Sequence, residues 1–134
     1  GFSLVEGLRL WPIIDISIDI PGSERGWKAA HTGGIMNGIM IIVVAISLTR
    51  LRLTTGQVKW VYWLFVCTAW GNTLFYWLGN FSTNRGLSVS ETRFGEGDLY
   101  GALAYLIVTP VMVLTVMGCW IIMREGFRGS GSER

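Results

Sequence analysis

Three long stretches without a charged side chain limit what this chain can fold into more than any other feature. They run over residues 32–49, 60–84 and 99–123 and contain 18, 25 and 25 residues. Because about 20 apolar residues in a helix cross a hydrocarbon core roughly 30 Å thick, each stretch approaches or exceeds the length of a bilayer span. Only 15% of the residues are charged, which is low for a soluble domain. The sequence predicts an all-α membrane protein, a transmembrane helical bundle in one domain, with spans at about 32–49, 60–80 and 99–123.

The first 22 residues differ in pattern from the rest of the chain. The chain begins with Gly1 rather than Met, and we interpret residues 1–22 as a truncated leader followed by an extended surface segment. Apolar and polar residues alternate strictly from Ile14 to Ile20, which is typical of an extended strand. Pro21 and Gly22 end this pattern, and Ser23 is a favourable N-cap for a helix. We expect the intact protein to have four spans.

The charged residues lie between the apolar stretches, at the two ends that a three-span bundle would have. One end carries six basic residues and the other five, although seven of the nine acidic residues fall at the second end. The positive-inside rule therefore gives little bias. We place the chain in a bacterial inner membrane with its C-terminus in the cytoplasm. The net charge of +2 reflects these loops and does not indicate a nucleic-acid surface.

Polar side chains inside the apolar stretches are candidates for a functional site, because burying them in a membrane is costly. Thr68, Asn72 and Tyr76 follow one another at four-residue spacing and so share one helix face. Hydrogen bonding between helices and a binding site explain this stripe equally well. Asn37 is the corresponding polar residue of the first stretch. It stands six residues after His31, so the two side chains do not share a face.

The single histidine, His31, lies at the start of the first stretch, beside small residues at four-residue spacing, namely Ala30, Gly34 and Gly38. Such a groove admits either a neighbouring helix, the commoner case, or a flat ring. A lone histidine at this depth is more often an interfacial side chain than a ligand. If it binds haem iron, one chain cannot supply two histidines, so Met36 or Met40 completes the coordination or a position stays open for ligand chemistry.

Several motifs resemble the styrene oxide isomerase family between about Asp19 and Tyr105. They lie in DIPGSERGWKAAHTGGIMNGIMI, WGNTLFYWLGNFSTNRGLS and GDLYGALAYL. The most specific are PGS-x-x-GW-x-x-AH, the pair Asn37-Gly38, and NFS-x-NRGL from Asn80 to Leu87. Members of that family are small four-helix membrane proteins that assemble as homotrimers and bind haem b. They convert an aryl epoxide to an aldehyde without net redox change.

The resemblance implies roles for residues that the polar pattern had singled out. His31 matches the axial ligand of a ferric haem b, and Asn37 and Tyr76 match polar residues at the epoxide. Thr68 and Asn72 share the helix face of Tyr76 and complete the expected catalytic set. Ferric iron would act as a Lewis acid, and a 1,2-hydride shift would follow ring opening.

Arg85 is our expected partner for a haem propionate, because guanidinium pairs well with carboxylate. One position departs from the family, since Thr68 stands where our alignment has aspartate in the styrene oxide enzymes. A threonine cannot supply a negative charge. Two other functions stay open from the sequence: a non-catalytic haem-binding membrane subunit, and a haem-free accessory bundle in a larger membrane complex.

Overall fold

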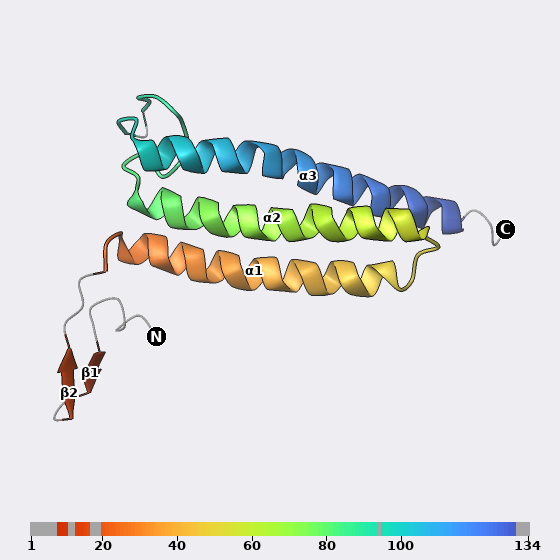
Figure 1. Cartoon of the computed structure of the whole chain (residues 1–134), viewed down its shortest axis with the longest axis horizontal. Helices are drawn as coiled ribbons and strands as arrows, with labels where there is room; N and C mark the ends of the chain where they lie inside the picture. The colour runs from red at the N-terminus through yellow and green to blue at the C-terminus, as the bar shows by residue number, and fades with distance from the viewer. Residues whose placement is uncertain (1–7, 11–12, 17–19, 94, 131–134) are drawn as a thin grey trace.

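The computed structural model describes residues 8–10, 13–16, 20–93 and 95–130, and its main elements are three long helices (Figure 1). Helix α1 covers Glu24–Leu48, α2 covers Thr55–Phe81 and α3 covers Leu99–Ser130. Each helix contains nearly all of one predicted span, so the three helical elements are confirmed. Helix α2 lies between α1 and α3 and packs against both (Figure 1).

Helices α1 and α3 are long and apolar enough to cross a membrane, by length and composition. The apolar surface of α2 is largely aromatic, and tryptophan and tyrosine rings are amphipathic. Helix α2 therefore has a lower mean hydropathy than α1 and α3 and is not one of the two candidate membrane spans. That α2 crosses the membrane stays a prediction, as does the fourth span.

A short strand pair precedes α1. Strands β1 (Leu8–Leu10) and β2 (Ile14–Ile16) pair antiparallel, with Arg9 opposite Asp15. The extended segment predicted from alternation is thus confirmed over Ile14–Ile16, while residues 17–19 lie outside the described part. The hairpin lies beyond the N-terminal end of α1 (Figure 1). It adds a small β element to the predicted helical fold.

The tightest packing joins α2 to α3 through small residues. An ideal Cβ on Gly71 would lie 2.2 Å from Val111 Cγ2, and one on Gly118 would lie 2.6 Å from Phe65 Cε2. Val61 of α2 and Ala104 of α3 are fully buried. Glycine at these positions lets the two helices approach closely, as is common in membrane bundles.

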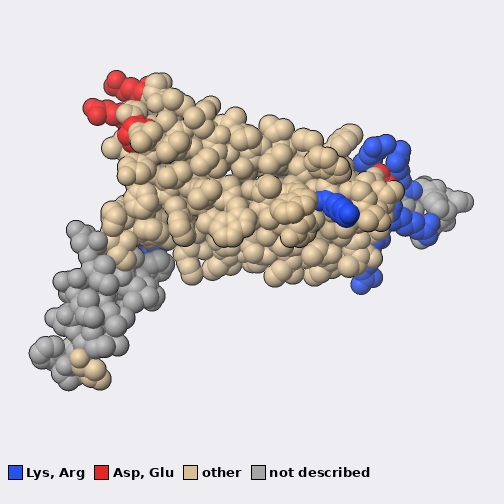
Figure 2. All heavy atoms as spheres, in the orientation of Figure 1, with Lys and Arg blue, Asp and Glu red and all other residues tan. Residues whose placement is uncertain are grey.

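The outer faces of the helices are apolar, and the charges gather at the two ends (Figure 2). Trp60, Trp70, Leu106 and Val116 are each at least 60% exposed. In the orientation of Figure 2, acidic side chains lie over the loop between α2 and α3, and basic side chains surround the opposite end. An apolar surface of this extent suits contact with lipid or with another protein chain.

Candidate functional site

Two amide side chains form a buried polar contact between α1 and α2. Asn37 of α1 is 8% exposed, and its Nδ2 donates to the carbonyl oxygen of Ala69 at 3.2 Å. Asn72 of α2 donates from its Nδ2 to Asn37 Oδ1, also at 3.2 Å. These bonds fix the Asn37 amide and leave one of its two N–H groups without a partner among the described residues.

Tyr76, one turn beyond Asn72, packs its ring on the backbone of α1. An ideal Cβ on Gly33 would lie 2.2 Å from Tyr76 Cε2, so only glycine leaves room for the ring. Of the two occupants predicted for the groove of Ala30, Gly34 and Gly38, the structure does not place a neighbouring helix against its two glycines. Ala30 is buried, but a Cβ on Gly34 or Gly38 would meet nothing within 4 Å. The close approach of α2 uses Gly33, because this glycine rather than Gly34 faces α2.

Thr68 is the first residue of the same stripe along α2, but it contacts α3 rather than α1. It is 1% exposed, and its Oγ1 lies 3.1 Å from Thr115 Oγ1 of α3. Thr115 donates its only hydroxyl proton to the carbonyl oxygen of Val111 at 2.8 Å, so Thr68 is the donor between the two threonines. The predicted stripe on α2 therefore divides. Asn72 and Tyr76 contact α1, whereas Thr68 contacts α3.

His31 is exposed and lies in a shallow groove on one flank of the α1–α2 contact. This groove, the histidine groove, has a volume of about 510 Å³ and is lined by Trp27, Ala30, His31, Gly34, Ile35, Thr73 and Trp77. Two indole rings border it, and the small residues leave the surface of α1 flat beside the imidazole. The groove can receive a flat apolar ring next to a nitrogen ligand.

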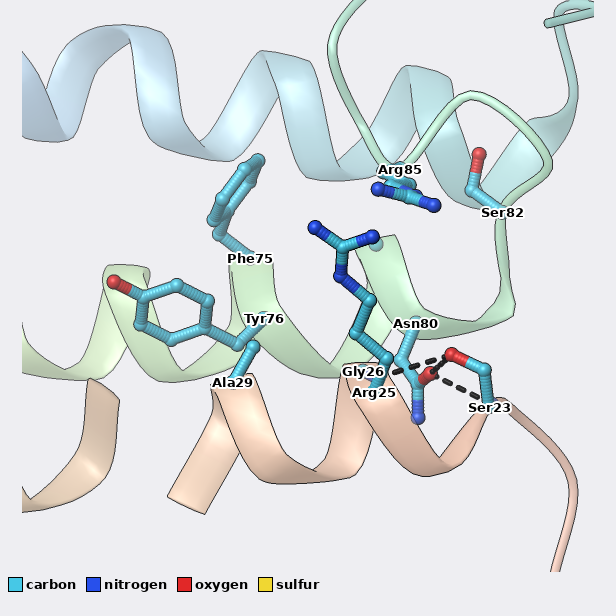
Figure 3. A pocket seen from close by; sticks show the side chains of 10 residues that line it. Ser23, Arg25, Gly26, Ala29, Phe75, Tyr76, Asn80, Ser82 and Arg85 are labelled. Carbon is cyan, nitrogen blue, oxygen red and sulfur yellow. Dashed lines mark hydrogen bonds between the residues drawn. The ribbon is translucent and has the colours of Figure 1, made fainter. Parts of the chain in front are cut away.

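A second cavity of about 390 Å³, the arginine pocket, lies between α1, the end of α2 and the loop that follows (Figure 3). Its polar wall contains Arg25 and Arg85, and its aromatic wall contains Phe75 and Tyr76. Arg25 was missed by the sequence analysis. It stands inside the family motif, but nothing in the local sequence links it to Arg85, 60 residues away.

Asn80 joins the two helices at the edge of the arginine pocket. Its Oδ1 accepts from the backbone N of Ser23 at 2.9 Å and from Ser23 Oγ at 3.1 Å (Figure 3). Ser23 Oγ also accepts from Gly26 N at 3.0 Å, which confirms Ser23 as the N-cap of α1. A Cβ on Gly26 would lie 1.7 Å from Asn80 Oδ1, so glycine is required there. This contact fixes the start of α1, two turns before His31.

The loop after α2 is held by the carboxylate of Asp98, which is only partly buried. Asp98 Oδ1 accepts from Gly101 N at 2.7 Å, and Oδ2 accepts from Thr83 N at 2.8 Å and Ser82 Oγ at 2.9 Å. Hydrogen bonds from the Gly101 and Thr83 backbone and from Ser82 and Thr83 side chains outweigh desolvation and lower the pKa of Asp98 from 3.8 to about 2. Asp98 thus caps α3 and ties its start to the end of α2.

The histidine groove and the arginine pocket share no lining residue. Helix α1 contributes Ala29 to the arginine pocket and His31 to the histidine groove, and two residues turn a helix by about 200°. The two cavities therefore open on opposite flanks of the α1–α2 contact. Within one copy of the chain, His31 does not face the cavity that Tyr76 lines.

Comparisons with known proteins match almost the whole chain, including both cavities. A family model described as styrene oxide isomerase matches residues 1–127. A styrene-oxide isomerase of Pseudomonas fluorescens is 32% identical to this chain over 131 residues, which are 98% of this chain and 78% of that protein. The matched range includes every residue that lines the two cavities.

Proposed function

Because this chain belongs to the styrene oxide isomerase family and is an epoxide isomerase, we propose that it converts a hydrophobic aryl epoxide to an aldehyde at a haem b site. The observation that carries this proposal is the family match along almost the whole chain, together with an accessible imidazole at His31. The proposed partners are the bilayer, which delivers the epoxide, and further copies of the chain.

His31 is the proposed axial ligand, and the histidine groove fits the group. Trp27 and Trp77 offer apolar rings on either side, and Gly34 leaves the surface of α1 flat. A ferric haem bound there would supply a Lewis acid for ring opening. These 134 residues contain one histidine, so they supply a single imidazole to the iron.

Asn37 and Tyr76 are the proposed hydrogen-bond donors to the epoxide oxygen. As the benzylic C–O bond breaks, negative charge develops on this oxygen and positive charge on the benzylic carbon. Fixed donors in a dry site stabilise such charge strongly. A hydride then moves with its electron pair from the oxygen-bearing carbon to the benzylic carbon, and the oxygen becomes the aldehyde carbonyl. All atoms remain in the product, so no external oxidant or reductant is needed.

Asn72 and Thr68 have different proposed parts in this site. Asn72 is a positioning residue, because it bonds to the Asn37 oxygen and so directs the remaining N–H of that amide. The Thr68 hydroxyl donates to Thr115, and its proposed role is to join α2 to α3. At the position of Thr68, the aspartate of the styrene oxide enzymes would add a negative charge that threonine does not carry.

We propose that the working site forms between copies in a closed homotrimer. The two cavities lie on opposite flanks, and a head-to-tail ring places one flank of each copy against the other flank of the next. His31 of one copy would then face the arginine pocket, and with it Tyr76, of its neighbour. The exposed apolar faces of α1 and α3 support burial against lipid and other copies.

The proposed location is a bacterial inner membrane with the C-terminus in the cytoplasm. Arg50, Arg52, Lys59, Arg124 and Arg128 lie at the end where α3 finishes, and the loop between α2 and α3 at the opposite end is acidic (Figure 2). Because the two ends carry six and five basic residues, the positive-inside rule favours this orientation only slightly.

The test of the proposed reaction uses styrene oxide labelled with deuterium on the terminal carbon. Haem-supplied protein should give phenylacetaldehyde with one deuterium moved to the adjacent carbon, and Tyr76→Phe should form it more slowly. Aldehyde without migrated deuterium would reject the hydride shift. Haem-loaded protein without aldehyde would favour a non-catalytic haem-binding subunit, and protein that binds no haem would favour the accessory bundle.

A further inference from the structure

The arginine pocket combines two positive charges with no acidic lining residue. Arg25 and Arg85 are its charged residues, and neither guanidinium forms an ion pair with any residue that the structure describes. In the view of Figure 3, both guanidinium groups lie above Asn80, and that of Arg25 lies between the Phe75 ring and Arg85. Two like charges that share a cavity repel each other, and a bound anion would remove that repulsion.

The backbone at Arg85 is held in a conformation that non-glycine residues rarely adopt. Its φ is 58°, in the left-handed region. The neighbouring Asn84 is fully buried, and its side chain accepts from Gly86 N at 2.9 Å and donates to Ser88 O at 3.0 Å. Gly79 lies directly under the turn, since a Cβ there would be 2.9 Å from Arg85 O. Such strain persists where surrounding contacts enforce it, and it concentrates at binding sites.

The rest of the pocket is suited to an apolar body beside the charge. Phe75 and Tyr76 supply aromatic walls, and Ala29 is the small residue that lines the pocket from α1. The cavity of about 390 Å³ has the size of a small-molecule site. A planar carboxylate matches the fork of a guanidinium better than a spherical anion does.

We propose that Arg25 and Arg85 form a clamp for a carboxylate carried on an apolar ring system. Two sources of this chemistry are possible: a propionate of the bound haem, or a free arylcarboxylate. The haem source rests on the proposed function, and because the pocket lies on the flank opposite His31, that haem would be held by the histidine of a neighbouring copy.

The haem source is tested by comparing haem b with its dimethyl ester, in which both propionates are neutral. Loss of each to excess apomyoglobin is followed at the Soret band in the full-length oligomer. We expect the parent to lose the ester about tenfold faster than haem b, and the double variant Arg25→Gln/Arg85→Gln to lose both at the faster rate. Arg52→Gln, an exposed arginine at the other end, is the matched control and should keep the parent's difference.

The free carboxylate is tested on haem-free protein by calorimetric titration with benzoate and with neutral benzamide. For this source, benzoate should bind about tenfold more tightly than benzamide to the parent and equally weakly to the double variant. If the parent loses the ester faster than haem b and the double variant does not distinguish them, the clamp binds a haem propionate. If only the preference for benzoate over benzamide depends on the two arginines, the clamp binds a free acid. If neither measurement depends on the two arginines, the proposal is wrong. Parent protein that takes up no haem would contradict the proposed cofactor, and the benzoate titration alone would then decide the clamp.

Discussion

The hydrogen bonds of each polar residue decide which groups remain available for chemistry. Asn37 uses one N–H on the Ala69 carbonyl and its Oδ1 on Asn72, so one N–H remains. Thr68 has a single proton, and Thr115 receives it. Thr68, Asn72 and Tyr76 look equivalent in the sequence because they share one face of α2. They differ in the structure because Asn72 and Tyr76 contact α1, whereas Thr68 contacts α3.

The difference between Asn37 and Thr68 can be measured by kinetics. Asn37→Ala should lower kcat by about 10²- to 10³-fold, as loss of one oxyanion donor does in other enzymes. Thr68→Val should destabilise the bundle by about 1 kcal/mol, through one lost hydrogen bond, and change kcat less than about threefold. Aldehyde formation and thermal unfolding in detergent give both values. A hundredfold loss of kcat in Thr68→Val would make Thr68 a catalytic residue.

Two adjacent glycines provide a matched test of the α1–α2 contact. Gly33→Ala would force a methyl group into the Tyr76 ring, and we expect overpacking to cost about 1–3 kcal/mol and to reduce turnover. Gly34→Ala places the same methyl group in open space and should be neutral or slightly stabilising. Thermal unfolding of the two variants compares them directly. Equal stability would contradict the packing of Tyr76 on Gly33.

At the level of elements, the start of α3 depends on one carboxylate. Asp98 accepts from Gly101 N inside the helix and from Thr83 N in the preceding loop. The ionised form makes these bonds, and they lower its pKa from 3.8 to about 2. A carboxyl group with a lowered pKa in the folded state stabilises that state fully only above its unfolded pKa.

Acid should therefore weaken the folded state between about pH 4 and pH 2 as Asp98 is protonated. Asp98→Asn should lower the Tm at neutral pH and should show a smaller decrease of Tm over that interval. Circular dichroism melts at closely spaced pH values would measure both effects. Parallel curves for parent and variant would show that Asp98 does not contribute to the acid response.

The helices and one of their caps could be predicted from sequence because they depend on local pattern. The uncharged runs gave three helices, and Ser23 gave the start of α1. The choice of Gly33 over Gly34 could not be predicted, because it depends on how α1 is rotated against α2. The arginine pocket also escaped prediction, since Arg25 and Arg85 meet only through tertiary structure.

For the whole molecule, the separation of the two cavities would leave one copy incomplete as the proposed site. His31 opens on one flank of the α1–α2 contact, and Tyr76 lines a cavity on the other. A ring of copies can bring these two flanks together, and its interface would cover part of the apolar surface of α1 and α3.

Mixed oligomers test the shared site. His31→Ala and Tyr76→Phe should each be impaired alone, and equal coexpression should restore roughly a quarter of the sites, those with both residues intact across one interface. Aldehyde formation by the purified mixture measures this recovery. Activity no greater than the mean of the separate variants would place the whole site within one copy.

The most direct test of the central claim is an absorption spectrum of detergent-purified, haem-supplied protein beside His31→Ala and Met36→Ala. We predict a ferric Soret band in the parent and in Met36→Ala, and loss of both the band and aldehyde formation in His31→Ala. No Soret band in the parent, or an unchanged band in His31→Ala, would contradict the claim that this histidine holds the haem of an epoxide isomerase.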